Sequence, residues 1–295
     1  MAASASNTTT VQYPIWIDEV EIYCDEAKLK HHLTHKLNYN ENDAARIFQQ
    51  ISGHIEQNSF LYFFWWSAAE EMSTEAIRVL LHSIEHSQLI RLLSYQDGLK
   101  YTALRCCAGS KRNEVIKVIL DSVSEKECYQ LLSITDDDLG WTPLHVSCMK
   151  GDTESVRLML NHINQDMRYS LLQMPNEDGD TPLYYASYNG YTDVIKLIHE
   201  SVTHSRWINL LQRKYVDVMT VLQTAAYENK QSCIDTIRDS VSDEEWLQLV
   251  STPLPEYNQR IHYELEYHQA VSRIDELRAA ARVKCVLLTQ DKSGI

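Results

Sequence analysis

Asp137-Asp-Leu-Gly140-Trp-Thr142-Pro-Leu-His145 and Asn176-Glu-Asp-Gly179-Asp-Thr181-Pro-Leu-Tyr184 are two versions of one segment. In each, a glycine lies two residues before a threonine, and Pro-Leu follows the threonine. Thr102 and Thr220 take the same place in two weaker copies, so the threonines at 102, 142, 181 and 220 are 40, 39 and 39 residues apart. A nearly constant interval of this kind is typical of a tandem repeat protein, in which each unit buries its apolar face against its neighbours.

Each of these four threonines is followed, at a constant offset, by a pair of aliphatic residues. An earlier unit fits the same register, with Phe63 in the threonine position. The pairs are Leu92/Leu93, Leu131/Leu132, Leu171/Leu172, Leu210/Leu211 and Leu249/Val250. We therefore expect five units, with every pair buried between adjacent units.

Each unit contains the start signals of three helices. The hydroxyl groups of Thr142 and Thr181 can cap a first helix, and the proline that follows suits the first helical position, where an N–H would have no partner. A second helix, with aliphatic residues at helical spacing, follows Gly151, which can adopt the positive φ that closes the first helix. Ser124-Glu-Lys-Glu127 and Ser242-Asp-Glu-Glu245 have the form of a capping box. They predict a short third helix ahead of the aliphatic pair.

These segments resemble the ankyrin repeat, whose signature is a glycine two residues before Thr-Pro-Leu-His, then alanines, a glycine and an aliphatic second helix. The match is nearly complete in the units of Thr142 and Thr181. The units of Phe63, Thr102 and Thr220 are degenerate, because Lys100 and Val218 replace the hairpin glycine while Trp66, Arg105 and Gln223 replace the histidine.

The interval also exceeds the usual ankyrin period of about 33 residues, and we assign the surplus to the third helix. HEAT-like repeats, with a period of about 40 residues, are the alternative, but they do not require Gly-x-Thr-Pro-Leu.

The resemblance implies an all-α, ankyrin-type helical solenoid with an extra short helix in each repeat and helical caps at both ends. We expect a flexible tail at residues 1–12, an N-terminal helical cap at 13–58, the repeat array at 59–252, and a C-terminal helical cap or degenerate repeat at 253–295. No strands are expected.

The two caps are expected to contain particular helices. The N-terminal cap should hold one helix around Ile17 to Leu37 and another that carries Ile47, Ile51 and Ile55. The C-terminal cap should hold a helix from Ala270 to Leu288.

The composition argues against several classes of protein. Lys and Arg number 27 against 41 Asp and Glu, which gives a net charge of −14, and no basic stripe is present that could bind nucleic acid. The longest apolar run, Phe60 to Trp66, is far shorter than the roughly 20 residues that cross a bilayer. The N-terminal residues do not form a signal peptide, and seven cysteines are an odd number. We therefore expect a cytoplasmic protein with reduced thiols, with no nucleic-acid or membrane partner.

Two histidine patterns could suggest zinc. His82-Ser-Ile-Glu85-His86 has the spacing of an inverted zinc-peptidase motif, which needs one continuous helix. In the other units the same stretch is a helix end and its turn, so the repeat register argues against zinc. His31 and His35 are one turn apart, but no cysteine or carboxylate completes a ligand set at a familiar spacing. We predict no metal and no cofactor.

Cys106-Cys107 lies next to Arg105, and a cation can lower the pKa of a thiol. Both cysteines occupy positions where the other units have packed residues, so a structural role is preferred. The sequence thus predicts no catalytic residue. A thiol- or metal-dependent enzyme on a helical solenoid remains the alternative, as does a targeting module of a longer protein.

In the ankyrin family, hairpin tips and first helices form the concave ligand surface. The resemblance therefore implies a protein-binding scaffold, and we expect it to be a monomer. Aspartates on this surface would favour a partner with basic and apolar side chains, and exposed aromatic residues and Met are typical of protein interfaces. Transferred position by position, the predicted partner-binding residues are Tyr101, Asp138, Trp141, Met149, Lys150, Asp178, Asp180, Tyr188, Asn189, Met219, Tyr227 and Glu228.

Overall fold

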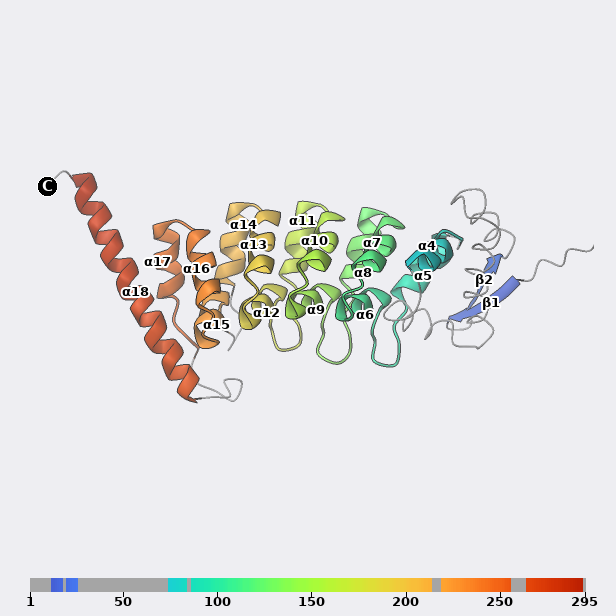
Figure 1. Cartoon of the computed structure of the whole chain (residues 1–295), viewed down its shortest axis with the longest axis horizontal. Coiled ribbons are helices and arrows are strands. Elements are labelled where there is room, and N and C mark those ends of the chain that lie inside the picture. The colour runs from blue at the N-terminus through green and yellow to red at the C-terminus, as the bar shows by residue number, and fades with distance from the viewer. Residues whose placement is uncertain are drawn as a thin grey trace, which may run out of the picture. The chain divides into compact units, whose positions relative to one another are not determined.

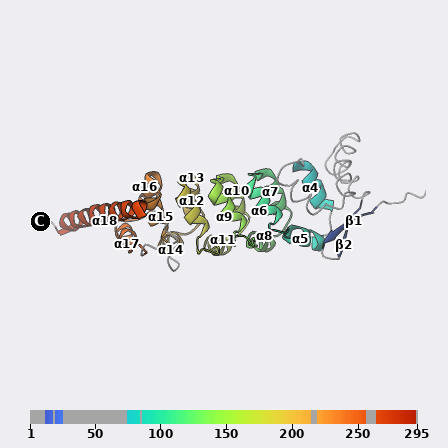
Figure 2. The same cartoon turned by 90° about the horizontal axis from the view of Figure 1, so that it is seen from below.

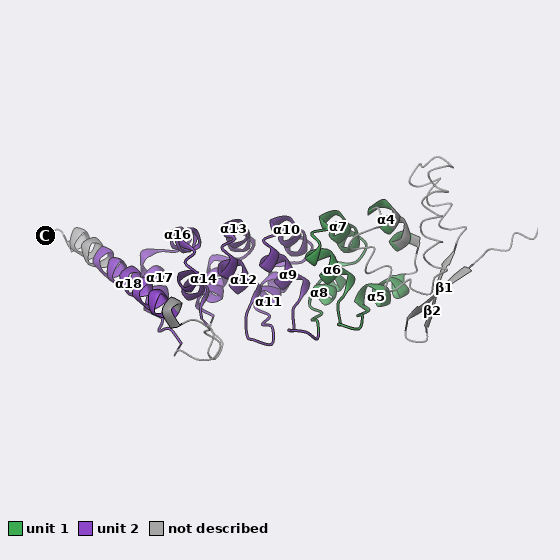
Figure 3. Cartoon of the chain, turned by 60° about the horizontal axis from the view of Figure 1, so that its bottom comes forward, with its two compact units in different colours: residues 1–136 green, residues 137–295 purple. Residues whose placement is uncertain are grey.

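The computed structural model describes the backbone at residues 12–17, 20–25, 74–83, 86–213, 219–255 and 264–293. The chain divides into two compact units, Met1–Asp136 and Asp137–Ile295 (Figure 3). Several expectations lie outside the described residues. They concern the helix with Ile47, Ile51 and Ile55, the Phe63 and Trp66 positions, the pair His31 and His35, and Val218.

The first unit contains an antiparallel pair of strands, β1 (Gln12–Ile17) and β2 (Val20–Asp25), in which Gln12 is opposite Asp25. This pair corrects three expectations: that the chain has no strands, that residue 12 belongs to a loose tail, and that a helix starts near Ile17. Both segments are rich in β-branched and aromatic residues, which favour a strand. Apolar spacing alone does not separate a helix from a strand in so short a segment.

The rest of the first unit is helical. α4 (Thr74–Ser83) and α5 (His86–Ser94) are the second and third helices of one repeat. α6 (Ala103–Gly109), α7 (Asn113–Asp121) and α8 (Glu125–Leu132) form the next repeat, that of Thr102.

The second unit contains three further repeats and a long final helix. Its first helices are α9 (Pro143–Lys150), α12 (Pro182–Asn189) and α15 (Val221–Tyr227). Its second helices are α10 (Thr153–Asn161), α13 (Thr192–Ser201) and α16 (Gln231–Asp239). Its third helices are α11 (Gln165–Leu172), α14 (His204–Gln212) and α17 (Asp243–Ser251), and α18 (Glu264–Ser293) follows.

In the second unit the helices form three rows. α9, α12 and α15 contact one another in series, and α10, α13 and α16 do the same. Figure 2 shows α9 and α12 between the row of second helices and the row that contains α11 and α14. The loops that precede α9 and α12 project from one edge of this arrangement (Figure 1). The third helices therefore flank the first helices on the side that the second helices leave uncovered.

The aliphatic pairs are buried as predicted. In both units, each of their members has an exposed fraction of at most 4%. The third helices α8, α11, α14 and α17 end at or just after these pairs, and no strand runs through residues 124–133. The prediction of an extra helix in each repeat is therefore confirmed, and it accounts for the long period.

The predicted helix starts are also confirmed. The hydroxyl groups of Thr102, Thr142, Thr181 and Thr220 each accept a hydrogen bond from the backbone N–H three residues later. Both bonds of a capping box are present at Ser124 with Glu127 and at Ser242 with Glu245. Local side-chain chemistry thus sets the start of most helices.

The backbone keeps one conformation where the sequence departs from the repeat signature. Nine residues past the threonine, Gly151 and Gly190 have φ of 64° and 87°, and Lys111 and Asn229 have φ of 55° and 54°. Lys100 likewise has a positive φ of 58° in the place of the hairpin glycine. The degenerate repeats therefore hold ordinary side chains in the left-handed conformation that glycine adopts at little cost.

Helix α18 packs against α15 and α17. It starts before and ends after the predicted range of 270–288, and Ala270, Ile274 and Ala281 are buried. Arg273 and Arg278 donate hydrogen bonds to the carbonyls of Ala226 and Val250, at 2.7 Å and 3.0 Å. Those carbonyls lie in the last turns of α15 and α17, where a cation also stabilises the helix dipole. We interpret α18 as a cap of the array.

Candidate partner-binding surface

In the repeats of Thr102, Thr142 and Thr220, the residue three positions after the threonine bonds to the following segment. Nδ1 of His145 accepts a hydrogen bond from the backbone N–H of Thr142 at 3.2 Å, and Nε2 donates one to the carbonyl of Asp180 at 3.2 Å. Gln223 makes the same two kinds of bond: its Oε1 accepts from the N–H of Thr220 at 3.0 Å, and its Nε2 donates to the carbonyl of Thr252 at 3.0 Å. Replacement of the histidine by glutamine therefore preserves the link.

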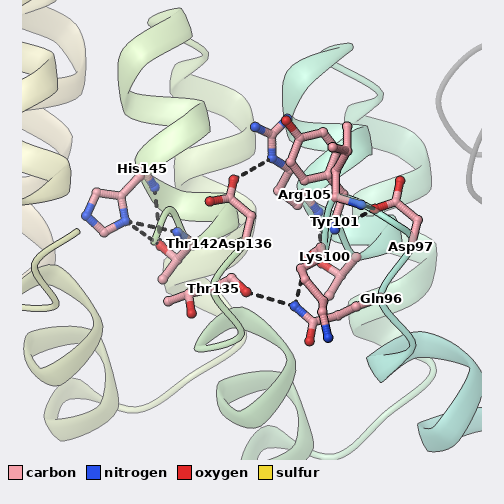
Figure 4. A network of polar contacts seen from close by, with 11 residues as sticks. Gln96, Asp97, Lys100, Tyr101, Arg105, Thr135, Asp136, Thr142 and His145 are labelled. Carbon is pink, nitrogen blue, oxygen red and sulfur yellow. Dashed lines mark hydrogen bonds and ion pairs between the residues drawn. The ribbon is translucent and has the colours of Figure 1, made fainter. Parts of the chain in front are cut away.

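Arg105 occupies this position in the first unit and makes the link with an ion pair (Figure 4). Its Nε lies 3.1 Å from Oδ2 of Asp136, whose side chain is only 1% exposed. The guanidinium carbon lies 3.6 Å from the centroid of the Tyr101 ring. Oδ1 of Asp97 accepts from the N–H of Tyr101 at 2.9 Å and holds the turn closed. Tyr101, predicted to bind a partner, is thus half-buried beneath an arginine of its own unit.

The hairpin ahead of α12 is closed by Asn176. Its N–H donates to the carbonyl of Asp180 at 2.9 Å, its Oδ1 accepts from the N–H of Asp180 at 2.8 Å, and its Nδ2 donates to the hydroxyl of Tyr185 at 2.9 Å. The N–H of Glu177 also donates to the carbonyl of Leu139 in the neighbouring tip at 2.9 Å. These bonds fix the tip that carries Asp178, which is exposed.

The predicted surface residues of the second unit fall into two groups. Asp138, Lys150, Asp178 and Tyr188 are exposed, and Tyr188 is 41% exposed. The partly exposed ones are Met149, Asp180, Asn189, Met219, Tyr227 and Glu228. Their accessibility is compatible with contact with a partner. Met149, Lys150, Tyr188, Asn189 and Tyr227 lie on the contiguous row of α9, α12 and α15, and the others lie in the segments before these helices or at their ends.

Trp141 differs from the expectation of an exposed aromatic residue. It is only 9% exposed, and its ring centroid lies 4.7 Å from that of Tyr185. The physical reason is that Tyr185, four residues into the next repeat, covers the indole ring. Trp141 therefore belongs to the packing between repeats and is removed from the set of candidate contact residues.

A cluster of three tyrosines on α12 was only partly anticipated. The rings of Tyr184 and Tyr188 are stacked, with centroids 6.0 Å apart and planes 26° apart. Tyr184 and Tyr185 make an edge contact at 5.4 Å. The spacing of Tyr184 and Tyr188, one helical turn apart, was the available signal. Transfer of single positions from the repeat signature selected Tyr188 alone.

The charges of neighbouring carboxylates act on this cluster. Burial is the main cause that raises the pKa of Tyr184, and the charges of Asp180 and Glu228 raise it further. Burial also raises the pKa of Tyr185, together with the charge of Asp180, and the Tyr185 hydroxyl lies 3.3 Å from Oδ2 of Asp180. The phenols therefore stay protonated, and the local charge is negative.

The thiols of Cys106, Cys107, Cys128 and Cys233 have raised pKa values, which is the opposite of activation. Burial raises the pKa of Cys106 to about 11 although the neighbouring Arg105 opposes the shift, and burial also raises the pKa of Cys107. The pKa values of Cys128 and Cys233 are raised to about 11, mainly by burial. A nucleophilic thiolate requires the opposite shift.

His82 and His86 lie on different helices, because α4 ends at Ser83 and α5 begins at His86. Nδ1 of His82 is 2.7 Å from the carbonyl of Arg78, and Nε2 of His86 is 2.9 Å from Oε1 of Glu127. The continuous helix of a zinc-peptidase motif is therefore not formed here. Across the described residues, no group of three or more His, Cys, Asp or Glu side chains is placed to hold a metal ion.

Comparison with known proteins agrees with this geometry. Residues 123–206 match the family model of ankyrin repeats, in 3 copies. No curated protein matches the chain. Among the helices that the structure describes, none has both the length and the apolar character needed to cross a membrane. Ankyrin repeats are generally protein–protein interaction modules and are typically non-catalytic. The repeats at residues 123–206 are therefore ankyrin repeats.

Proposed function

We propose that the chain is a non-catalytic scaffold that binds a partner protein through one surface of its second unit. This surface, called here the hairpin surface, comprises the hairpin tips at residues 137–140 and 176–180 and the C-terminal ends of α9, α12 and α15. The observation that carries the proposal is the exposure of Tyr188, a large aromatic side chain that is 41% accessible at the end of α12. Exposed aromatic residues of this kind are enriched at the centre of protein interfaces.

The charge of the hairpin surface favours a particular kind of partner. Asp138, Asp178, Asp180 and Glu228 contribute carboxylates, and the whole chain has a net charge of −14. Negative potential of this kind accelerates the approach of a positively charged partner and suppresses binding of acidic ones. The expected partner therefore presents basic and apolar side chains. A monomeric state and a cytoplasmic location remain predictions.

The third helices affect the proposal because they flank the first helices. With one row on each side, the accessible part of the first helices is mainly their C-terminal ends. The hairpin tips that precede α9 and α12 are also accessible. The partner would thus contact a narrower band than the full first-helix face. The alternative of a thiol-dependent enzyme gains no support from the raised pKa values of Cys106 and Cys107.

Site-specific photo-crosslinking in cells tests the proposal. A photoreactive amino acid is placed at Tyr188 on the hairpin surface, or at Asn209, an exposed residue of α14, as the matched control. We expect a partner to be captured from position 188 in preference to position 209, and the capture to fall when Asp178 and Asp180 are changed to lysine. Capture of the same partner from position 209 alone would contradict the proposal.

A further inference from the structure

A cavity with a volume of about 120 Å³ lies where the last repeat meets the capping helix α18. Its wall combines an apolar part, made by an indole ring and two alanines, with three charged side chains. None of these residues belongs to the hairpin surface. The lining residues are Arg238 of α16, Asp243 and Trp246 of α17, and Ala280, Ala281 and Lys284 of α18.

The charged side chains of the cavity carry an excess of positive charge. Nζ of Lys284 lies 2.8 Å from Oδ1 of Asp243, and Nη2 of Arg238 pairs with the same oxygen. The bond from Lys284 is the main cause that lowers the pKa of the Asp243 carboxyl, which is therefore ionised. Two cations thus share one carboxylate, and one positive charge is left over in a chain whose net charge is −14.

Both cations keep N–H groups that the described part of the chain does not use. Arg238 donates from Nη1 to the carbonyl of Val241 at 3.3 Å and from Nη2 to Asp243, whereas its Nε has no acceptor among the described residues. The ion pair with Asp243 is the only polar contact of Lys284 there, and the Lys284 side chain is 55% exposed. Because a guanidinium has five N–H groups and an ammonium has three, both can also donate to a ligand.

Size and charge indicate the chemical class of that ligand. A cavity of about 150 Å³ is large enough for benzene, so this cavity has room for about five non-hydrogen atoms. A guanidinium suits the planar carboxylate group, and a single negative charge would neutralise the excess. The second negative charge of a phosphate group would instead be repelled by Asp243. Trp246 and the two alanines offer an apolar surface to a short alkyl group.

We propose that this cavity binds a small carboxylate, with the carboxyl group between Arg238 and Lys284 and the alkyl group against Trp246. The carboxylate belongs either to a free short-chain acid or to the C-terminus of a peptide, which present the same chemistry. Since Arg238 lies on α16 and Lys284 on α18, the bound group would also join the last repeat to its cap. This site does not depend on the proposed scaffold function.

Titration of the full chain with propionate, at constant ionic strength, tests the proposal. The readout is the NMR signal of the Trp246 indole N–H, which is assigned by its loss in Trp246→Phe. We expect a saturable shift with a dissociation constant in the millimolar range, as is usual for a ligand of so few atoms. Propionamide, a neutral molecule of the same shape, should bind at least about tenfold more weakly, because the charge-assisted hydrogen bonds are lost.

Two further ligands define the class and the source of the carboxylate. Inorganic phosphate should bind no more tightly than propionate. An acetylated dipeptide that ends in alanine is compared with its C-terminal amide. Binding of the free-acid dipeptide at least as tightly as propionate would assign the site to a peptide C-terminus, and its exclusion would assign the site to a free acid.

Variants of the protein locate the site. Lys284→Gln and Arg238→Gln should each weaken propionate binding by about tenfold. Arg282→Gln is the matched control, because Arg282 is an exposed cation of α18 that does not line the cavity. Thermal unfolding of each variant establishes that the fold is intact.

Several results would overturn the proposal. Equal shifts with propionate and propionamide would show that the cations bind no carboxylate, and this comparison stands on the unmodified chain even if Arg238→Gln fails to fold. Unchanged binding in Lys284→Gln, or a loss of equal size in Arg282→Gln, would place the ligand elsewhere. Tighter binding of phosphate than of propionate would overturn the assignment to a carboxylate. Each of these results would leave the scaffold proposal standing.

Discussion

The repeats of Thr142 and Thr181 and the repeats of Thr102 and Thr220 have nearly the same backbone but use different side chains to hold it. The first two place glycine at the left-handed position nine residues past the threonine, whereas the other two place Lys111 and Asn229 there at φ of 55° and 54°.

At the position that links repeats, the Thr142 repeat uses His145, while the two degenerate repeats use Arg105 and Gln223. The difference teaches that the repeats of Thr102, Thr142 and Thr220 keep one backbone geometry and one linking bond, and make them with different side chains.

The largest expected effect comes from removing a buried leucine in either kind of repeat. Leu172→Ala in a regular repeat and Leu132→Ala in a degenerate one should each lower the free energy of unfolding by about 2 to 5 kcal/mol, because both side chains are fully buried. Urea denaturation measures this, with Leu139→Ala, at a position 40% exposed, as the control. A much smaller loss for Leu132→Ala would show that the degenerate repeat is less well packed than the regular one.

The linking position gives the next largest effect and should separate the two kinds of repeat. Arg105→Ala removes the cation paired with the buried carboxylate of Asp136 and should cost about 3 kcal/mol. His145→Ala removes neutral hydrogen bonds and should cost about 1 to 2 kcal/mol.

Arg157→Ala, which removes an exposed ion pair with Glu154, is the control for loss of an arginine. If Arg105→Ala cost no more than Arg157→Ala, the buried ion pair would have no structural role. Asp136→Asn in the Arg105→Ala background should recover part of the loss.

Substitutions at the left-handed position should change the stability in opposite directions in the two kinds of repeat. Gly151→Ala should destabilise the protein by about 2 kcal/mol, because φ is 64° and a Cβ atom would lie 2.6 Å from the Tyr191 ring. Lys111→Gly should stabilise it by about 0.5 to 1 kcal/mol, because the strain of a side chain at positive φ is relieved. Thermal melts of the two variants measure both signs, and destabilisation by Lys111→Gly would contradict the account of strain.

The smallest expected effect is on the stability of the fold at low pH. Hydrogen bonds from Ser124 and Ser242 are the main cause that lowers the pKa of Glu127 and Glu245 below the ordinary value of 4.5. A carboxyl whose pKa is lower in the folded state contributes stability above the unfolded pKa, and this contribution is lost as the pH falls through the folded value. Both side chains are partly exposed at the surface, where solvent screens their interactions, so the change is small.

The double variant with Glu127→Gln and Glu245→Gln should therefore show a shallower loss of stability below about pH 4.5, which unfolding at several pH values would detect. Glu125→Gln is the control, because Glu125 takes no part in the capping box. If the stability of the double variant fell with pH as steeply as that of the unmodified chain, these two carboxylates would not contribute to the loss of stability in acid.

Local signals in the sequence predicted most of the array. Threonine caps, capping boxes and aliphatic pairs act within a few residues or at the repeat interval, so one chain suffices to find them. Contacts between repeats were not predictable in the same way. The burial of Trp141 depends on Tyr185 of the next repeat, and the ion pair between Arg105 and Asp136 spans 31 positions of sequence.

The ends of the chain followed the repeat pattern least. Strands β1 and β2 form where a helix was expected to start near Ile17, because both segments are rich in β-branched and aromatic residues. Helix α18 extends beyond its predicted range at both ends, and within that range Arg273 and Arg278 make docking bonds that the apolar pattern did not predict. Among the candidate contacts, the repeat signature identified Tyr188 correctly as exposed and could not show the ring that supports it.

The central claim is that partners bind to the hairpin surface, and hydrogen–deuterium exchange of the full chain tests it most directly. The chain is measured alone and with a bound peptide or a captured partner. We expect increased protection at residues 176–189 and 219–228, with little change in α11, α14 and α17. Protection confined to those third helices, with the hairpin surface unchanged, would contradict the account.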